Sequence, residues 1–391
     1  MRILWLMFVL HLACGLLFGG MPEIKVTARD SGGHGLLCTA GKKRVLVVEG
    51  TPEQMGAAHG RLMAATIPRV MPQTMSLVGA AYTIKKGIWF HDKIDEIYGL
   101  ASPHTPVRFI DECNAMADAA GITRRDVICG NFFPELFHCS GVAVRNTATA
   151  GGRVVHARVL DYMRDINLQR YALVQVFIPK DGYAWISLGY AGLVGTVTAM
   201  NEHGLAIGEM GGASDESWNG MPMTFLMREI AERTRSVDEA VALMKRVPRT
   251  CEYFYVVSDA AKNMVGIRAR VEDLMVLQPG EQHELLPPVP ADTVMFSGGS
   301  RAKELSRRLH AALGKIDVQT MIEIIKRPVA MRSNLHNAIF LPETLDMWVA
   351  DAGKKSPACD EPYTMVNLRQ IIDFYRMETA KVVGPAQGAD Y

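Results

Sequence analysis

The stretch CSGVAVRNTATAGGRVVHARVLDY, residues 139–162, decides the fold. Two runs in which apolar and polar residues alternate flank the turn signal TAGG, a pattern that predicts a β-hairpin turning near Ala150. Counted outward from that turn, Cys139 lies opposite Asp161. Directly opposite residues of an antiparallel pair have Cβ atoms about 4.5 to 5.5 Å apart. The hairpin is therefore expected to bring a thiol and a carboxylate together.

Blocks of strands and blocks of helices follow the hairpin. Residues 171–210 contain three further strand-like runs separated by Gly- and Asn-containing turns, which indicates an antiparallel sheet. Helical patterns then cover 223–247 and 301–328, and strand patterns cover 252–271 and 335–352. Blocks of this kind predict a layered α+β domain rather than a βαβ winding.

Upstream of Cys139 the pattern is mainly helical. Residues 43–50, KRVLVVEG, predict a strand, and Thr51 then caps a helix that begins with Pro52. A second helix is predicted up to Gly121. We therefore expect a mainly helical segment over residues 21–138.

Residues 1–20, MRILWLMFVLHLACGLLFGG, carry Arg2 and then an uncharged apolar run, which is typical of an export signal. About 20 apolar residues also suffice for an uncleaved membrane anchor. Cys14 lies in a sequence that resembles a lipoprotein cleavage box, but His11 stands where that box has an aliphatic residue. We expect an exported protein, periplasmic or extracellular, with either a signal peptide or a membrane anchor.

Composition excludes several classes of protein. A chain of 391 residues with 49% hydrophobic content is globular, and its 42 basic and 41 acidic residues create no field that would attract nucleic acid. Its seven cysteines include no Cys-x-x-Cys pair, so neither a zinc ribbon nor another metal site is expected. The sequence leaves disulfide pairing and oligomeric state open.

A family resemblance adds to this interpretation. The Cys-Ser start, the Arg-x-Leu-Asp of the return strand and the Asn-Glu-x-Gly-Leu-Ala hairpin within residues 192–210 resemble, in order and spacing, the N-terminal-nucleophile amide hydrolases. These are the autoproteolytic acyltransferases typified by penicillin acyl-coenzyme A acyltransferase, with relatives among choloylglycine hydrolases and acid ceramidase. Residues 49–63 and 115–136 are also similar, so the resemblance covers most of 43–215.

The resemblance implies a four-layer αββα sandwich and a mechanism of activation. In that family the chain is cut before the nucleophile, here between His138 and Cys139. Residues 21–138 would become a small fragment and 139–391 the catalytic domain. The freed α-amino group, with a reference pKa of about 7.7 to 8.0, can then take the proton of its own thiol. The implied reaction cleaves an N-acyl amide through a Cys139 thioester, with hydrolysis favoured over acyl transfer, and needs no cofactor.

Four further residues receive roles from the resemblance. Arg158 would favour the thiolate, Asp161 would orient the new amine, and Asn201 would bind the oxyanion. Arg301 is similar to a second arginine of the bile-salt enzymes and would contact substrate. Each also has a structural reading, as a strand charge, a turn carboxylate, a hairpin residue or a helix-start arginine. A regular strand would place Arg158 and Asp161 on opposite faces, so both reach one site only through a bulge, a twist or the length of the arginine.

Two other classes stay open on the sequence. The Thr-Asn-His or Thr-Asn-Ser element of many relatives is missing, so the chain could be a non-catalytic relative that binds a ligand or serves a structural role. A papain-like cysteine hydrolase is the second alternative, although the signature CGSCW is missing as well. Only the N-terminal-nucleophile class requires a cut before Cys139. The identity of the acyl chain and of the amine is left open.

Overall fold

The computed structural model describes residues 20–132, 139–162, 164–212 and 217–383. The apolar run at residues 1–19 and the expected cleavage residue His138 lie outside these ranges. No helix in the described ranges is long and apolar enough to cross a membrane.

The N-terminal part of the fold begins with strands and continues with helices. Its elements are β1 (Ile24–Arg29), β2 (Gly35–Ala40), β3 (Lys43–Gly50), α2 (Pro52–Leu62), α3 (Ile67–Lys86), α4 (Phe90–Ala101), α5 (Val107–Ala120) and α6 (Arg124–Phe132). The strand at 43–50 is as expected, whereas β1 and β2 were not. Residues of β1 alternate between partly buried and exposed, as in an edge strand with one face toward solvent.

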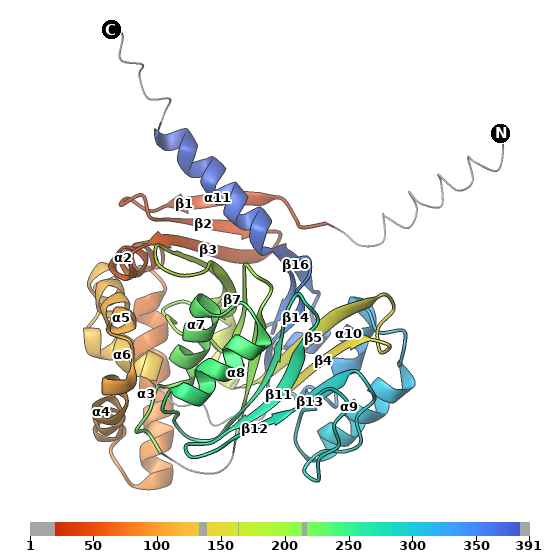
Figure 1. The fold of residues 1–391 in the computed structure, drawn as a ribbon. Coiled ribbons are helices and arrows are strands. Elements are labelled where there is room, and N and C mark those ends of the chain that lie inside the picture. Colours follow the sequence, from red (N-terminus) through yellow and green to blue (C-terminus); the bar gives the residue numbers. More distant parts are fainter. Residues whose placement is uncertain (1–19, 133–138, 163, 213–216, 384–391) are drawn as a thin grey trace, which may run out of the picture.

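A run of strands begins directly after Cys139 (Figure 1). It consists of β4 (Ser140–Asn146), β5 (Gly152–Asp161), β6 (Ala172–Pro179), β7 (Trp185–Tyr190), β8 (Thr198–Asn201) and β9 (Ala206–Gly211). The remaining elements are α7 (Met223–Arg233), α8 (Val237–Arg246), β10 (Tyr253–Ser258), β11 (Met264–Ala269), β12 (Leu274–Leu277), β13 (Thr293–Phe296), α9 (Gly299–Ala311), α10 (Val318–Ile325), β14 (Asn334–Leu341), β15 (Asp346–Asp351), β16 (Thr364–Asn367) and α11 (Leu368–Val383).

These strands form two sheets that stack face to face. One has the order β1-β2-β3-β6-β7-β8-β9-β10-β11-β12 and the other β13-β4-β5-β14-β15-β16. Helices α2 and α7 contact the outer face of the larger sheet and α10 contacts that of the smaller one, with α9 packed beside it (Figure 1). The expected four-layer αββα sandwich is confirmed.

Strand β3 shows how the layers create the sequence pattern. Val45 and Val47 share a core cluster with Phe340 and Met347 of the smaller sheet, whereas Leu46 of the same strand packs in the cluster that contains the helices. Both faces of the strand are therefore buried, which explains its continuous apolar run. β3 also pairs in parallel with β6, so the segment before Cys139 contributes interior strands to the larger sheet.

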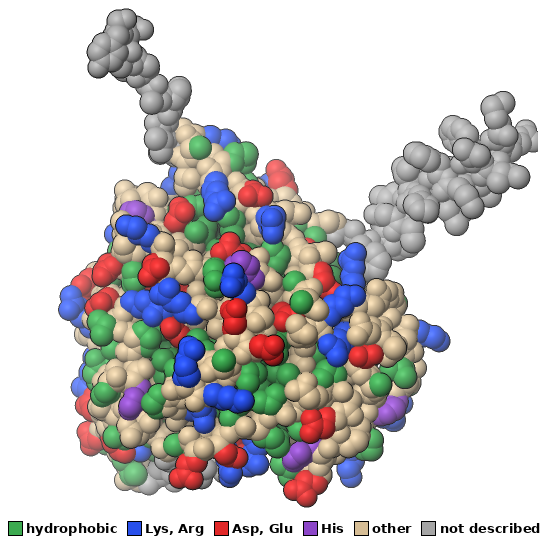
Figure 2. Space-filling view, in the orientation of Figure 1, with side chains coloured by type: hydrophobic (Ala, Val, Ile, Leu, Met, Phe, Trp, Pro, Cys, Tyr) green, Lys and Arg blue, Asp and Glu red, His purple; other side chains and the backbone are tan. Residues whose placement is uncertain are grey.

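The surface carries no field of a single sign on the face shown in Figure 2. Basic and acidic side chains are interspersed there, and hydrophobic ones form small groups between them. This distribution agrees with the formal net charge of +1.

Candidate active site

Cys139 immediately precedes β4, and its side chain is buried, with 5% exposed. Its Sγ lies 3.5 Å from Nη2 of Arg158. Arg158 pairs with Gly141, two residues after Cys139, so the strand alternation places the thiol and the guanidinium on one face of the sheet. The structure therefore brings together the first two of the residues expected in the site.

The expected pairing of Cys139 with Asp161 is wrong by one residue. Ser140 pairs with Val159, so the ladder places Leu160 opposite Cys139. The count from the sequence centred the turn on Ala150, whereas the pair next to the turn, Asn146 with Gly152, centres it on Thr149, and the register shift at the end of β4 recovers one of the two positions lost. A bulge of this kind changes every pairing on one side of it by one position.

Arg158 is fully buried between the sheets and is held by several groups. Its Nε donates to the backbone oxygen of Glu209 at 3.1 Å, and its Nη2 lies 3.3 Å from Glu209 Oε2. Nη1 donates to Nε2 of His336 at 3.1 Å. The sequence analysis missed both partners. The signal for Glu209 was an acidic residue inside the apolar strand AIGEM, a position where a charge must be paired.

The thiol of Cys139 is protonated near neutral pH in this environment. Its pKa is raised to about 12, chiefly by burial and also by Glu209 and the Asp161 carboxylate, while Arg158 and the backbone N–H of Asp161 oppose the increase. A buried thiol of this kind is a poor nucleophile until a base removes its proton. The chemistry therefore requires a base beside Sγ.

Asp161 and Arg301 form an ion pair on the other face of β5. Arg301 Nη2 donates to Asp161 Oδ2 and, at 2.7 Å, to Ser140 Oγ, while Asp161 Oδ1 accepts from the backbone N–H of Met331 at 2.9 Å. Arg158 and Asp161 thus point to opposite faces, as regular alternation requires. The carboxylate nevertheless lies beside the start of β4, because it shares Arg301 with Ser140.

The carboxyl of Asp161 should make stability depend on pH. Burial raises its pKa from 3.8 to about 6, with Arg301 the strongest opposing influence. Between these values the folded chain holds a proton that the unfolded chain has lost, so the free energy of unfolding falls as pH rises. Relative to Asp161→Asn, wild type should lose on the order of 3 kcal/mol between pH 4 and 7. Urea titrations across this range measure the difference, and parallel profiles would contradict it.

Asn201 makes its side-chain hydrogen bonds to groups outside this cluster, so its expected role in binding the oxyanion beside Cys139 stays a prediction. Its Nδ2 donates to the backbone oxygens of Ala231 at 2.9 Å and Thr234 at 2.7 Å. Its Oδ1 accepts from the backbone N–H groups of His203 and Leu205, both at 3.1 Å. These contacts use both donors and both acceptor positions of the amide. Asn201 therefore ties the β8–β9 hairpin to the end of α7.

Asn201→Ala should accordingly lower stability and leave the chemistry of folded enzyme intact. The change leaves three buried backbone groups and one partly buried group without this partner, which should cost about 2 to 3 kcal/mol. Thermal unfolding measures this loss, and kcat determined well below the melting temperature should stay near that of wild type. A fall in kcat without a fall in melting temperature would return Asn201 to the active site.

A different asparagine, Asn334, lies next to Asp161. The two residues pair across β5 and β14, and the Asn334 side chain hydrogen-bonds to the carboxylate and lowers its pKa. Asn334 Nδ2 also donates to the backbone oxygen of Leu160 at 3.0 Å. The sequence analysis did not single it out, because nothing near Asn334 matches the expected Thr-Asn-His element.

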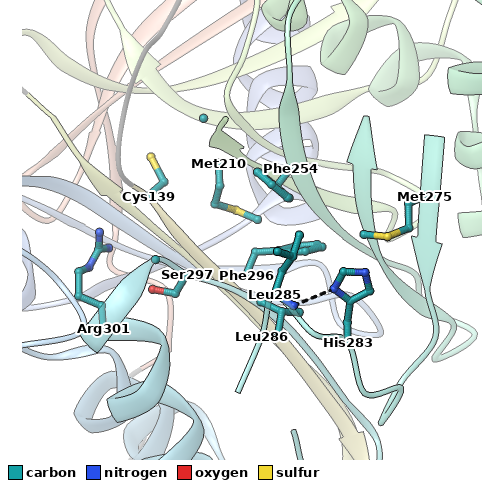
Figure 3. Close-up of a pocket in the computed structure, with 12 residues that line it drawn as sticks. Cys139, Met210, Phe254, Met275, His283, Leu285, Leu286, Phe296, Ser297 and Arg301 are labelled. Carbon is teal, nitrogen blue, oxygen red and sulfur yellow. Dashed lines mark hydrogen bonds between the residues drawn. The ribbon is translucent and has the colours of Figure 1, made fainter. Parts of the chain in front are cut away.

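An apolar cavity of about 200 Å³ opens from the thiol (Figure 3). Cys139 and Arg301 lie at one side of it, and Met275 and His283 lie at the opposite side, with aromatic and aliphatic side chains between them. The lining residues are Cys139, Met210, Gly211, Phe254, Met275, His283, Leu285, Leu286, Phe296, Ser297, Gly298 and Arg301. The cavity can therefore hold an apolar group in contact with Sγ.

Metal binding and disulfides do not contribute to the described part of the site. Within the described ranges, no group of three or more His, Cys, Asp or Glu side chains could hold a metal ion. The six cysteines of those ranges, Cys139 included, are free and buried.

Comparison with known proteins supports the resemblance found in the sequence. The family model described as acyl-coenzyme A:6-aminopenicillanic acid acyl-transferase matches residues 148–277, which is less than half of the chain. This range contains Arg158 and Asp161 and begins after Cys139. The resemblance to this acyltransferase family is thereby confirmed.

The individual relatives share low sequence identity with this chain. The chain is 26% identical over 356 residues to protein dcd1A of Dictyostelium discoideum, covering 80% of this chain and 79% of that one. It is 24% identical over 340 residues to protein dcd1B of the same organism, covering 76% and 65%. Among solved structures, a Caenorhabditis elegans N-acylethanolamine-hydrolyzing acid amidase ortholog gives a TM-score of 0.44 at 18% identity, over 52% of this chain and 93% of that one. A mutant conjugated bile acid hydrolase from Clostridium perfringens gives 0.40 at 12% identity, over 59% and 93%.

Proposed function

We propose that this protein is a cysteine amidohydrolase that cuts itself between His138 and Cys139 and then cleaves the acyl–nitrogen bond of a small N-acyl amide. The observation that carries the proposal is the position of the Cys139 thiol, which contacts the Arg158 guanidinium and borders an apolar cavity. The match to the acyltransferase family supports the reaction type. The apolar run at residues 1–19 supports export or membrane anchoring.

The base in this proposal is the α-amino group of Cys139. It takes the thiol proton as Sγ attacks the substrate carbonyl, and a tetrahedral oxyanion forms. Collapse of this intermediate breaks the carbon–nitrogen bond, and the proton passes to the departing amine. Water then attacks the thioester, so the products are a carboxylic acid, the amine and regenerated thiol. Hydrolysis is proposed over transfer because water is the abundant acceptor.

Charged groups around the thiol supply the other functions that the proposed mechanism requires. Arg158 stabilises the thiolate, and Asp161, anchored by Arg301 beside the first residue of β4, holds the new amine. With Asn201 occupied elsewhere, the oxyanion is assigned to the N-terminal end of α9. Its cap residue, Gly298, lines the cavity and no side chain caps the helix there, so backbone N–H groups can face the developing charge.

The cavity indicates an apolar acyl group rather than a charged one. Met210, Phe254 and Phe296 form its walls, and burial of an apolar chain against them is worth about 25 cal/mol per Å². The amine part of the substrate would then lie toward Arg301 and solvent.

Two measurements test the proposal. Intact mass and N-terminal sequencing of purified protein should find two chains, one of which begins Cys-Ser-Gly-Val. A screen over N-acyl amines, N-acyl amino acids and bile-acid amides should show release of free acid from an apolar substrate. An intact chain that hydrolyses such substrates would refute the mechanism. An intact and inactive chain would instead favour the non-catalytic, ligand-binding alternative.

A further inference from the structure

A buried chain of hydrogen bonds leads from the thiol into the space between the sheets. Arg158 Nη1 donates to Nε2 of His336 at 3.1 Å, and the Tyr190 hydroxyl lies 3.0 Å from Nδ1 of the same ring. Thr198 Oγ1 lies 3.1 Å from Nε2. Arg158 and His336 belong to the smaller sheet, whereas Tyr190 and Thr198 belong to the larger one. His336 therefore connects the two sheets at the point where Arg158 faces Cys139.

These contacts determine which nitrogen of the His336 ring carries the proton. A guanidinium only donates hydrogen bonds, so Nε2 of His336 accepts and the ring proton lies on Nδ1, where it is donated to the Tyr190 hydroxyl. Burial lowers the pKa of His336 well below its usual value, and the charges of Arg158 and Lys43 lower it further. The imidazole is thus a neutral acceptor for Arg158 at any pH near neutrality.

A register shift in β14 gives His336 this orientation. Asn334 and His336 are two residues apart and would share a face of a regular strand. The ladder with β5 is irregular between them, and the Asn334 side chain contacts Asp161 while His336 contacts Arg158. Bulges commonly redirect side chains beside functional sites. The bulge in β14 therefore lets Asn334 contact Asp161 on one face of β5 and His336 contact Arg158 on the other.

We propose that His336 is a positioning residue that holds the Arg158 guanidinium so that Nη2 meets the Cys139 thiol. Glu209 binds Nε and Nη2 of Arg158, and His336 binds Nη1, so the guanidinium is held from two directions. His336 is 0% exposed and therefore acts through Arg158 rather than on substrate. The inference rests on the proposed role of Cys139 as nucleophile.

Two substitutions separate positioning from packing. The glutamine Oε1 of His336→Gln can occupy the place of Nε2 and accept from Arg158, whereas the shorter amide of His336→Asn reaches only the place of Nδ1 and Tyr190. Misplacing a catalytic group by about 1 Å can cost about 100-fold in rate. We expect His336→Asn to lose about this factor in kcat with KM unchanged, and His336→Gln to stay within about fivefold of wild type.

A second readout needs no substrate. The pH dependence of Cys139 alkylation by iodoacetamide, followed by peptide mass spectrometry, reports the pKa of the thiol. The charged groups that face the thiol or line its cavity, namely Arg158, Asp161, Glu209 and Arg301, are retained in both variants. Because a displaced guanidinium no longer favours the thiolate, the midpoint should move to higher pH in His336→Asn and stay in place in His336→Gln.

His156→Asn is the matched control. His156 is also 0% exposed and lies on β5 two residues before Arg158, but its Nδ1 bonds to Ser258 Oγ at 2.9 Å. This variant should have a lower melting temperature than wild type, and the pH dependence of its Cys139 alkylation should be the same as in wild type.

The outcomes distinguish this inference from the proposed function. An unshifted alkylation profile in His336→Asn, or equal losses of kcat in both His336 variants, would assign the residue to packing and overturn the positioning role. A shifted profile in a protein that hydrolyses no acyl amide would uphold the positioning of Arg158 and remove the proposed function.

Discussion

Replacing Cys139 with alanine should leave the chain at full length and lower acyl-amide hydrolysis by more than about 10⁴-fold, because in the proposed mechanism the same thiol makes the cut and forms the thioester. Folding should be little affected, since alanine fills most of the volume of a buried cysteine. Intact mass and a hydrolysis assay on the same preparation measure both effects.

Cys113→Ala is the control for this experiment. Cys113 is also a buried free thiol, on α5, where its pKa is raised strongly by burial. It should remain cut and active after substitution. Self-cleavage or undiminished hydrolysis in Cys139→Ala would show that the nucleophile is another group.

Arg158→Met should both destabilise the protein and inactivate it. The substitution removes the buried guanidinium that pairs with Glu209 and faces the thiol. Leaving one member of a buried ion pair behind costs about 3 to 5 kcal/mol. The same change removes the positive charge that favours the thiolate, so kcat and the alkylation of Cys139 should fall at every pH below the thiol pKa.

A second buried arginine separates these two effects. Arg228 is 1% exposed, and its Nη2 and Nε donate to Glu112 and Glu232, both at 2.7 Å. Arg228→Met should cost a similar free energy of unfolding and leave the reactivity of Cys139 unchanged. Its cost should shrink toward acid pH, because burial already raises the pKa of Glu112 to about 7 and loss of the cation raises it further. Equal loss of thiol reactivity in both variants would show that Arg158 acts through stability alone.

Local patterns in the sequence predicted the strands of the site but not how its residues face one another. Alternation in residues 139–162 predicted β4 and β5, whereas the predicted register paired Cys139 with Asp161 and placed Arg158 on the opposite face. The shared face of Cys139 and Arg158 follows from the observed pairing of Arg158 with Gly141. The order of strand blocks and helix blocks along the chain predicted the α+β class. The family resemblance predicted the four-layer αββα sandwich. These features depend on neighbours along the chain or on one short turn.

Other features depend on contacts between distant strands, which a single sequence does not show. The hairpin turns about Thr149 rather than Ala150, and together with the bulge beside the turn this places Leu160, not Asp161, opposite Cys139. Asn201 fits the sequence pattern of a hairpin residue and also that of an oxyanion-binding residue. Its contacts with α7, which a single sequence does not show, favour the first. Glu209 and His336 meet Arg158 from strands β9 and β14, 51 and 178 residues along the chain.

The parallel pairing of β3 with β6 bears on what a cut before Cys139 would produce. Two chains would result, but the shorter one would still supply the first three strands of the larger sheet, and its Glu112 would still be bonded to Arg228 of the longer one. Separating the chains would mean breaking a sheet in its interior. The mature protein should therefore migrate as one particle in native gel filtration and as two bands in detergent. The cut would therefore free the α-amino group of Cys139 without separating the two chains.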